Sequence, residues 1–318
     1  MPNYSGSWNL VQQMQAVAAS NWPNPPPAVG AIGIFAIGAS TGNIAVSTRN
    51  KYTFSGCVNT SATSATSNSC SGAAAGNSTV GIFALGSICG CGSTTRNKYI
   101  YACCSNVTAT VSTVKSAEGA ATGNSTIGIF ALGSTTSAAS TTRNKYTYSN
   151  DTNGSATASS VSSHAGAATG NACIGIFAIG DSGACNVTTR NKYTYSGDTN
   201  GSATAATSAS SYGTAAGNST VGIFSLGFTT GISAARNKYT FSGCVNSSAT
   251  AASAASYTGS AAGNSTVGIF ALGNAGAGPS TTRNKYTYSG CVNASATASS
   301  AASQSGAAAS NGTTGVNV

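Results

Sequence analysis

Ionisable side chains are scarce in this sequence. Its 318 residues include four acids and one histidine, and charged residues make up only 5% of the chain. The acids Glu118, Asp151, Asp181 and Asp198 are scattered, and His164 has no partner motif. A glycosidase needs two carboxylates about 5 to 9.5 Å apart, and a hydrolase triad needs a histidine beside its nucleophile. We therefore expect no enzymatic activity, no catalytic residue and no cofactor.

Long apolar runs are also missing. No stretch approaches the roughly 20 apolar residues that a membrane-spanning helix needs, so we expect no membrane span. The first residues, Met1 to Trp8, hold neither the basic segment nor the apolar segment of a signal peptide. We therefore expect a protein that does not leave a cell by the usual export route.

The scarcity of charge does not indicate disorder. Disordered segments usually combine high charge with few apolar residues, whereas this chain is 41% hydrophobic. Its formal net charge of +9 comes from a repeated Arg-Asn-Lys triplet, and of the 13 basic residues only Lys115 lies outside it. We expect a folded chain whose charge belongs to its repeat.

One pattern organises the chain. In its second copy it reads Val-Gly-Ile-Phe-Ala-Leu-Gly from Val80, followed by Arg-Asn-Lys-Tyr from Arg96. A fixed period of this kind indicates stacked copies of one supersecondary unit. The six copies place their phenylalanine, 46 to 48 residues apart, at Phe35, Phe83, Phe130, Phe177, Phe224 and Phe270.

Each copy contains four predicted strands. In the second copy they span residues 72–75, 80–85, 96–102 and 107–114, with a Gly-Asn-Ser turn between the first two. The second is apolar on both faces and the third alternates. Four strands in one such repeat are the content of a β-propeller blade.

The two ends of the repeat array predict a closed ring. The first copy begins at its second strand, residues 32–35, whereas residues 306–316 repeat a first strand and turn and then stop. Pairing these ends leaves no open sheet edge, whereas an open array needs capping repeats. The sequence therefore predicts an all-β fold, with a six-bladed propeller over residues 28–318 that is closed by its C-terminal strand.

Residues 1–27 differ from the repeats. Ser7 suits a helix N-cap, and apolar residues follow at helical spacing until the proline run at 25–27. We expect a short amphipathic helix and a stiff proline-rich connector. The helix either caps the propeller or anchors it to another subunit, and both interpretations stay open. The anchor residues are Trp8, Leu10, Val11, Met14 and Trp22.

The ten cysteines lack the paired spacing of a zinc site, so we expect no metal. One turn position, eight residues after the repeat arginine, is cysteine in four copies and aspartate in two. We expect mostly free thiols, with Cys173–Cys185 and Cys70 with Cys89 or Cys91 as disulfide candidates. The turn position holds Cys57, Cys104, Asp151, Asp198, Cys244 and Cys291.

The repeat resembles the kelch repeat. The resemblance covers residues 28–318 and lies in Gly-Asn-Ser-Thr-Val-Gly-Ile-Phe-Ala-Leu-Gly, followed by Asn-Lys-Tyr-Thr-Tyr-Ser-Gly-Asp at 191–198. A single glycine such as Gly86 replaces the kelch glycine pair, and the kelch tryptophan is absent. The resemblance implies a kelch-like propeller.

Residues 5–16, with Asn-Trp-Pro at 21–23, resemble leader segments of repeat-bearing structural proteins of tailed bacteriophages, cyanophages in particular. This resemblance implies a virion component, such as a tail or neck appendage or fibre, that is assembled in the host cytoplasm. The N-terminal segment would bind other virion proteins, and oligomerisation is compatible with this role. The alternative is a cellular surface lectin or a protein-interaction propeller.

Loops that vary among the copies, at 86–93, 133–140 and 273–280, are the predicted contacts with host-surface glycan or another virion protein.

The basic triplet predicts a ring of twelve cations, because residues two apart share one face of a strand. In one interpretation the ring is a rim that binds anionic glycan, lipopolysaccharide, nucleic acid or an acidic virion surface. In the other, which its regularity favours, each arginine ties blades together through loop carbonyls and each lysine is solvated. Nucleic acid is the weakest partner. The ring comprises Arg49, Lys51, Arg96, Lys98, Arg143, Lys145, Arg190, Lys192, Arg236, Lys238, Arg283 and Lys285.

Overall fold

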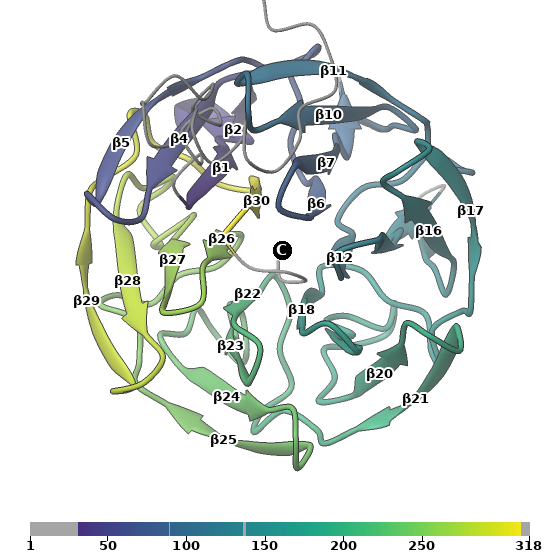
Figure 1. Ribbon diagram of the computed structural model, residues 1–318. Coiled ribbons are helices and arrows are strands. Elements are labelled where there is room, and N and C mark those ends of the chain that lie inside the picture. Colours follow the sequence, from purple (N-terminus) through teal and green to yellow (C-terminus); the bar gives the residue numbers. More distant parts are fainter. Residues whose placement is uncertain (1–30, 89, 136–137, 313–318) are drawn as a thin grey trace, which may run out of the picture.

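The protein is a six-bladed β-propeller. The computed structural model describes residues 31–88, 90–135 and 138–312. Six four-stranded antiparallel sheets stand as blades around a central axis (Figure 1). Within the described residues the helical element is η1 (Thr41–Asn43), a short 3-10 turn, and no described helix is long and apolar enough to cross a membrane. The predicted N-terminal helix and its anchor residues lie outside the described residues.

Each blade has four strands, numbered outward from the axis. The first strands are β30 (Ala307–Ser310), β6 (Ala73–Gly76), β12 (Ala120–Gly123), β18 (Ala167–Gly170), β22 (Thr214–Gly217) and β26 (Ser260–Gly263). The second strands are β1 (Ile32–Ala36), β7 (Val80–Ala84), β13 (Ile127–Ala131), β19 (Ile174–Ala178), β23 (Val221–Ser225) and β27 (Val267–Ala271).

The third strands are β4 (Arg49–Thr53), β10 (Arg96–Ile100), β16 (Arg143–Thr147), β20 (Arg190–Thr194), β24 (Arg236–Thr240) and β28 (Arg283–Thr287). The outermost strands are β5 (Val58–Ala62), β11 (Ser105–Ala109), β17 (Thr152–Ala156), β21 (Thr199–Ala203), β25 (Val245–Ala249) and β29 (Val292–Ala296). Short hairpins between second and third strands are β2 (Ala39–Ser40) with β3 (Ile44–Ala45), β8 (Ser87–Ile88) with β9 (Cys91–Gly92), and β14 (Ser134–Thr135) with β15 (Ala138–Ala139).

The C-terminal strand closes the ring, as the sequence predicts. Strand β30 pairs antiparallel with β1, so that Ala308 lies opposite Phe35 and Ala309 opposite Ile34. Blade one thus takes its first strand from the end of the chain and its other three strands from the beginning. The circle is completed by sheet hydrogen bonds between residues about 275 positions apart.

The outermost strand is shorter than predicted. The sequence predicts a strand over 107–114 in the second copy, whereas β11 spans Ser105–Ala109. The next residue, Thr110, turns toward blade three, where its N–H donates to Asp151 Oδ1 at 3.3 Å and its hydroxyl donates to the Asp151 carbonyl. Contacts with the neighbouring blade therefore end the strand, and sequence periodicity does not reveal them.

The hydrophobic core lies between blades rather than inside one layer. A typical cluster joins Ile129 of blade three to Phe177 and Tyr193 of blade four. Near the axis the blades converge, and the first strands use small residues there. The second strand of blade two, β7, approaches such a first strand at Gly81. A Cβ on Gly81 would lie 2.7 Å from the Tyr101 hydroxyl and 3.0 Å from Ala309 Cβ in β30 of blade one. Glycine at this position allows the close approach of the two blades.

The ring has two different faces, because antiparallel strands place successive connections at opposite ends of a blade. We call one the hairpin face. It carries the connections between second and third strands, such as 85–95, and the residues that precede each first strand, such as 70–72. The other, the turn face, carries the turns after the first and third strands, such as 77–79 and 101–104.

Candidate functional site

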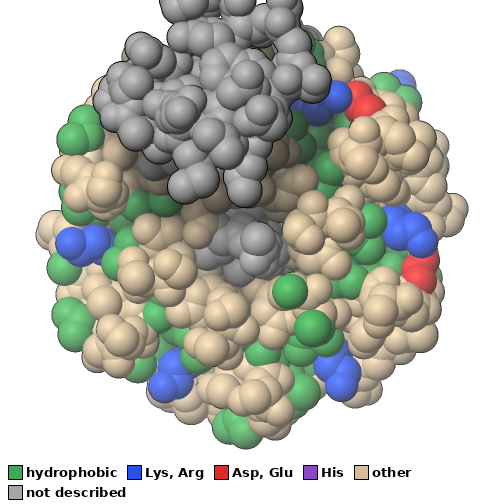
Figure 2. Space-filling model, in the orientation of Figure 1, with side chains coloured by type: hydrophobic (Ala, Val, Ile, Leu, Met, Phe, Trp, Pro, Cys, Tyr) green, Lys and Arg blue, Asp and Glu red, His purple; other side chains and the backbone are tan. Residues whose placement is uncertain are grey.

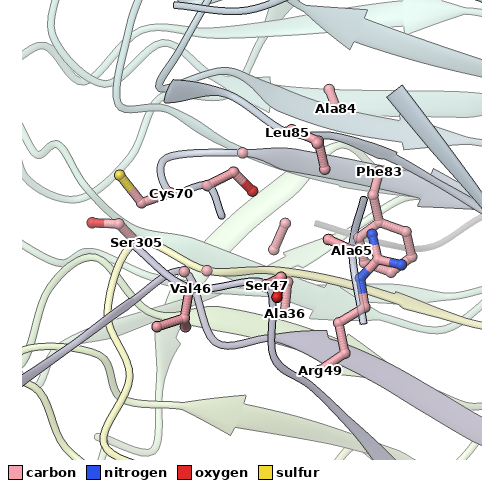
Figure 3. Close-up of a pocket in the computed structure, with 15 residues that line it drawn as sticks. Ala36, Val46, Ser47, Arg49, Ala65, Cys70, Phe83, Ala84, Leu85 and Ser305 are labelled. Carbon is pink, nitrogen blue, oxygen red and sulfur yellow. The ribbon is translucent and has the colours of Figure 1, made fainter. Parts of the chain in front are cut away.

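The arginines of the predicted basic ring lie between blades. The Arg49 guanidinium of blade one stacks 4.4 Å from the centre of the Phe83 ring of blade two (Figure 3). Its Nη1 donates to Asn106 Oδ1 at 2.7 Å, and its Nη2 donates to Asn97 Oδ1 at 3.2 Å. Every blade repeats this arrangement, and Arg283 completes the circle by bonding Asn59 and Asn50 of blade one.

These arginines are structural clamps. All six are at most 1% exposed, so the arginine half of the predicted rim is absent from the surface. The partners are asparagine side chains and phenylalanine rings rather than the loop carbonyls that the sequence suggested. Burial lowers the pKa of each clamp arginine to about 10. The aromatic faces and amide oxygens offset part of the cost of burying these charges.

The lysines of the ring are partly exposed, and three of them contact the next blade. Lys98 pairs with Asp151 at 2.7 Å, and Lys145 pairs with Asp198 at 2.7 Å. Figure 2 shows basic side chains spaced around the periphery of one face, with acidic side chains beside some of them. The surface ring therefore consists of lysines alone: Lys51, Lys98, Lys145, Lys192, Lys238 and Lys285.

The Lys145–Asp198 pair belongs to a larger hydrogen-bond network. Burial alone would raise the pKa of Asp198, but hydrogen bonds from Lys145, the Thr157 N–H and the Tyr193 hydroxyl outweigh it. They hold the pKa of this carboxyl group well below its usual range. The acid is therefore part of a fixed contact between blades three and four.

A closed circle of backbone hydrogen bonds surrounds the axis on the hairpin face. The Ser71 N–H donates to the Ser305 carbonyl at 2.7 Å, and the Ser71 carbonyl accepts from the Glu118 N–H at 2.8 Å. The same step repeats from blade to blade until the circle closes. Its members all have φ between 52° and 57°: Ser71, Glu118, Ala165, Tyr212, Thr258 and Ser305.

The side chains around this circle differ in every blade. The residue before each circle member pairs with the hairpin segment of its own blade, as His164 does with Asp181. These three positions per blade therefore carry different side chains although the backbone pairing around them is the same. The sets are Gln304, Ser305 and Ala39; Cys70, Ser71 and Ser87; Ala117, Glu118 and Ser134; His164, Ala165 and Asp181; Ser211, Tyr212 and Phe228; and Tyr257, Thr258 and Asn274.

The turn face, by contrast, repeats the same residues. The turn after the first strand reads Gly-Asn-Ser-Thr in four copies. In each, the asparagine Oδ1 accepts from the N–H two residues on, as Asn77 does from Thr79 at 2.9 Å. A surface whose residues are needed for its own turns is poorly suited to selective recognition, so diversity on a rigid scaffold favours the hairpin face.

Three aromatic rings gather on the hairpin face at blades five and six. The rings of Tyr212 and Tyr257 are 6.3 Å apart at 74°, and those of Phe228 and Tyr257 are 6.3 Å apart at 70°. Phe228 is 39% exposed. Edge-to-face contacts of this kind hold the rings in place while leaving aromatic surface open. We call these three residues the aromatic cluster.

Two carboxylates lie beside the aromatic cluster. Burial, and then the negative charges of Glu118 and Asp181, raise the pKa of Tyr212. Ala165 stands between Glu118 and Tyr212 in the backbone circle. The other two acids of the protein are paired with lysines on the turn face. The unpaired acidic charge of the described residues is thus concentrated here.

The crevices found between blades within the described residues are small. The one lined by Arg49, Phe83 and Ser305 has a volume of about 20 Å³ (Figure 3), room for about one water molecule. This crevice is too small for a sugar.

The cysteines of the described residues are unpaired. Cys173 and Cys185 are exposed and not bonded to each other, Cys70 and Cys91 are likewise free, and Cys89 lies outside the described residues. Across the described part of the chain, no three His, Cys, Asp or Glu residues are grouped closely enough to hold a metal ion.

The varied loops named from the sequence lie on the hairpin face, where residues 86–93 and 133–140 contain the hairpins β8–β9 and β14–β15. The regular basic triplet does not predict the aromatic cluster or the position of Glu118 beside it. The signal was present. Aligning the copies on the glycine before each first strand gives Cys-Ser, Ala-Glu, His-Ala, Ser-Tyr, Tyr-Thr and Gln-Ser in front of it.

No protein-family model and no curated protein matches this chain. The kelch and bacteriophage resemblances therefore rest on the motifs described in the sequence analysis, whereas the propeller rests on the strand pairing above.

Proposed function

We propose that this protein is a non-enzymatic structural and adhesion component of a tailed-phage virion, in which the hairpin face binds a host-surface glycan. The observation that carries the binding role is the aromatic cluster of Tyr212, Tyr257 and Phe228 beside Glu118 and Asp181. The virion assignment is supported by the resemblance of residues 5–16 to phage leader segments.

The chemistry of the cluster suits a neutral or amine-bearing sugar. Exposed aromatic faces stack against the C–H faces of a pyranose, and carboxylates accept hydrogen bonds from its hydroxyl or ammonium groups. Glu118 and Asp181 would repel an anionic sugar. The basic triplet suggested an anionic glycan as one ligand. The aromatic cluster favours an uncharged or cationic glycan instead.

The turn face is the side on which virion contacts are proposed. Its lysines form a regular ring, and two of them are already paired with aspartate, so this face presents a repeated and weakly basic surface. The N-terminal segment, through Trp8, Leu10, Val11, Met14 and Trp22, is the proposed anchor to other virion proteins. In this proposal the protein is assembled in the host cytoplasm and located in the virion.

The glycan role is tested on an array of neutral, amino and acidic glycans. The full chain should retain neutral or amino glycans, and Tyr257→Ala should weaken that binding at least tenfold, because it removes the ring that contacts both other aromatics. Lys192→Gln on the turn face is the matched control and should bind normally. Retention of acidic glycans alone, or equal binding by Tyr257→Ala and the parent, would reject the role of this cluster.

The virion role is tested separately, by capture from disrupted candidate virions with the full chain and with a Trp8→Ala, Trp22→Ala double variant. The full chain should retain a virion protein and the double variant should lose it, while both keep glycan binding. If neither protein captures a virion protein but glycan binding persists, the alternative of a cellular surface lectin is correct.

A further inference from the structure

Four of the six turns after the third strands place a cysteine in an unusual backbone conformation. Cys57, Cys104, Cys244 and Cys291 have φ of 50° or 51°, in the left-handed region that glycine, asparagine and aspartate adopt most readily. The other two blades have Asp151 and Asp198 at this position. A residue type that fits the turn poorly, yet recurs in four blades, points to a property of the thiol itself.

One of these turns contacts a lysine of the preceding blade, and the repeat places a lysine at the equivalent position before each of the others. Lys238 Nζ of blade five lies 3.7 Å from Cys291 Sγ of blade six. At the equivalent contacts, Lys98 and Lys145 form ion pairs with Asp151 and Asp198 at 2.7 Å. The Lys238 amine and the Cys291 thiol therefore occupy the positions that an ion pair takes at the junctions of Lys98 with Asp151 and of Lys145 with Asp198. Both residues are partly exposed, so a small oxidant can reach the sulfur.

We propose that Lys238 and Cys291 form a reversible covalent cross-link between blades five and six when the protein meets a peroxide. The equivalent pairs are Lys51 with Cys104, Lys192 with Cys244, and Lys285 with Cys57, which joins the last blade to the first. The two junctions that carry aspartate keep their ion pairs. Oxidation thus staples four of the six junctions of a ring that is otherwise held without covalent bonds between its ends.

The chemistry balances with hydrogen peroxide as the oxidant. The Cys291 sulfur attacks one peroxide oxygen, the O–O bond breaks, and the thiol proton joins the leaving hydroxide, so that sulfenic acid and water form. The neutral Lys238 amine then attacks the sulfur, the S–O bond breaks, and an S–N bond forms as the hydroxyl group leaves with a proton as a second water. The sulfur loses two electrons and the peroxide gains them. Two equivalents of an external thiol reverse the link, restoring the amine and the thiol and forming a disulfide.

The test is a tryptic digest of the intact protein after peroxide treatment and alkylation of the remaining thiols. Without a link, trypsin cuts after Lys238 and releases residues 239–283 and 286–318. In molecules linked at this junction alone, cutting after Lys238 is blocked, and residues 237–283 appear joined to 286–318 with a mass two hydrogen atoms below the sum. Dithiothreitol should restore the separate peptides. Cutting after Lys98, which faces Asp151, should be unaffected by peroxide and is the internal control.

Two variants complete the test. Cys291→Asp introduces the residue that blades three and four use at this turn, so it should fold and give no cross-linked peptide at this junction. Lys238→Arg keeps the charge but lacks the reactive amine, and it should also give none. Peroxide should raise the melting temperature of the parent more than that of either variant. Full release of 239–283 after peroxide, with Cys291 recovered as sulfinic acid or as a disulfide, would overturn the proposal.

Discussion

The hydroxyl of Ser225 accepts a hydrogen bond from Nε of Arg236 at 3.0 Å, within blade five. The other five blades have alanine opposite the clamp arginine, for example Ala178 opposite Arg190. There the arginine Nε is buried and has no hydrogen-bond partner among the described residues. Blade five therefore satisfies the arginine Nε donor, which stays unpaired in the other five blades. The unpaired Nε atoms are those of Arg49, Arg96, Arg143, Arg190 and Arg283.

Exchanging these residues should change stability in opposite directions. Ser225→Ala should lower the free energy of unfolding by about 1 kcal/mol because it leaves Arg236 Nε unpaired, and Ala178→Ser should raise it by a similar amount. Urea denaturation of both variants and the parent measures the effect. A loss of stability in both variants would show that Nε is already satisfied by an ordered water in the inter-blade crevice.

Arg283, the clamp arginine that joins blade six to blade one, should contribute as much to the free energy of unfolding as any other clamp arginine. Arg283→Met removes two hydrogen bonds to blade one and the stacking on Phe35, and Arg143→Met removes the same contacts inside the array. Each should cost about 3 kcal/mol of unfolding free energy, measured by chemical denaturation. A much smaller effect of Arg283→Met would indicate that the ring is open in solution.

The protein should unfold at alkaline pH. Burial raises the pKa of Tyr239 and Tyr286 to about 12. It raises the pKa further for the tyrosines at 52, 99, 101, 148, 193, 195 and 288. The unfolded value is about 10, so the unfolded chain loses these protons first. The stabilisation is complete below pH 10 and is lost as pH rises through the folded values.

The clamp arginines act in the opposite direction above pH 10, because burial lowers their pKa to about 10, but they are fewer than the tyrosines. We therefore expect a constant melting temperature up to about pH 9.5 and a steep fall above it. Tyrosinate absorbance should rise together with unfolding. Titration of most tyrosines near pH 10 in a protein that stays folded would contradict this expectation.

The Lys145–Asp198 contact should weaken in acid. The pKa of Asp198 is lower in the folded protein than in the unfolded chain, so its stabilisation is present above the unfolded pKa of about 3.9. It is lost as pH falls through the folded value. Asp198→Asn should reduce stability at pH 7 by up to about 1 kcal/mol, since both partners are partly exposed.

Comparing the parent with Asp198→Asn between pH 7 and pH 2 checks this result. The stability difference between the two proteins should shrink at the acid end. A difference that is independent of pH would assign the effect to the turn backbone, where Asp198 has φ of 48°, rather than to the ion pair.

Much of the architecture was determined by the sequence. The period of the phenylalanines, the four strand patterns per copy and the leftover first strand at 306–316 predicted the closed six-bladed ring, because a repeat this short can bury its apolar face only against its neighbours. Sequence periodicity also placed the ends of most strands within two residues of those observed, with the outermost strand as the exception.

The tertiary structure alone decided what the polar residues do. Arg49 and Lys51 share one strand face, yet the arginine is buried against blade two while the lysine stays partly exposed. The burial of Arg49 depends on its contacts with Asn97, Asn106 and Phe83, residues 34 to 57 positions away in the sequence. The aromatic cluster likewise assembles from separate blades. Local sequence cannot predict these inter-blade contacts, since they form only when the ring closes and brings distant copies within contact distance.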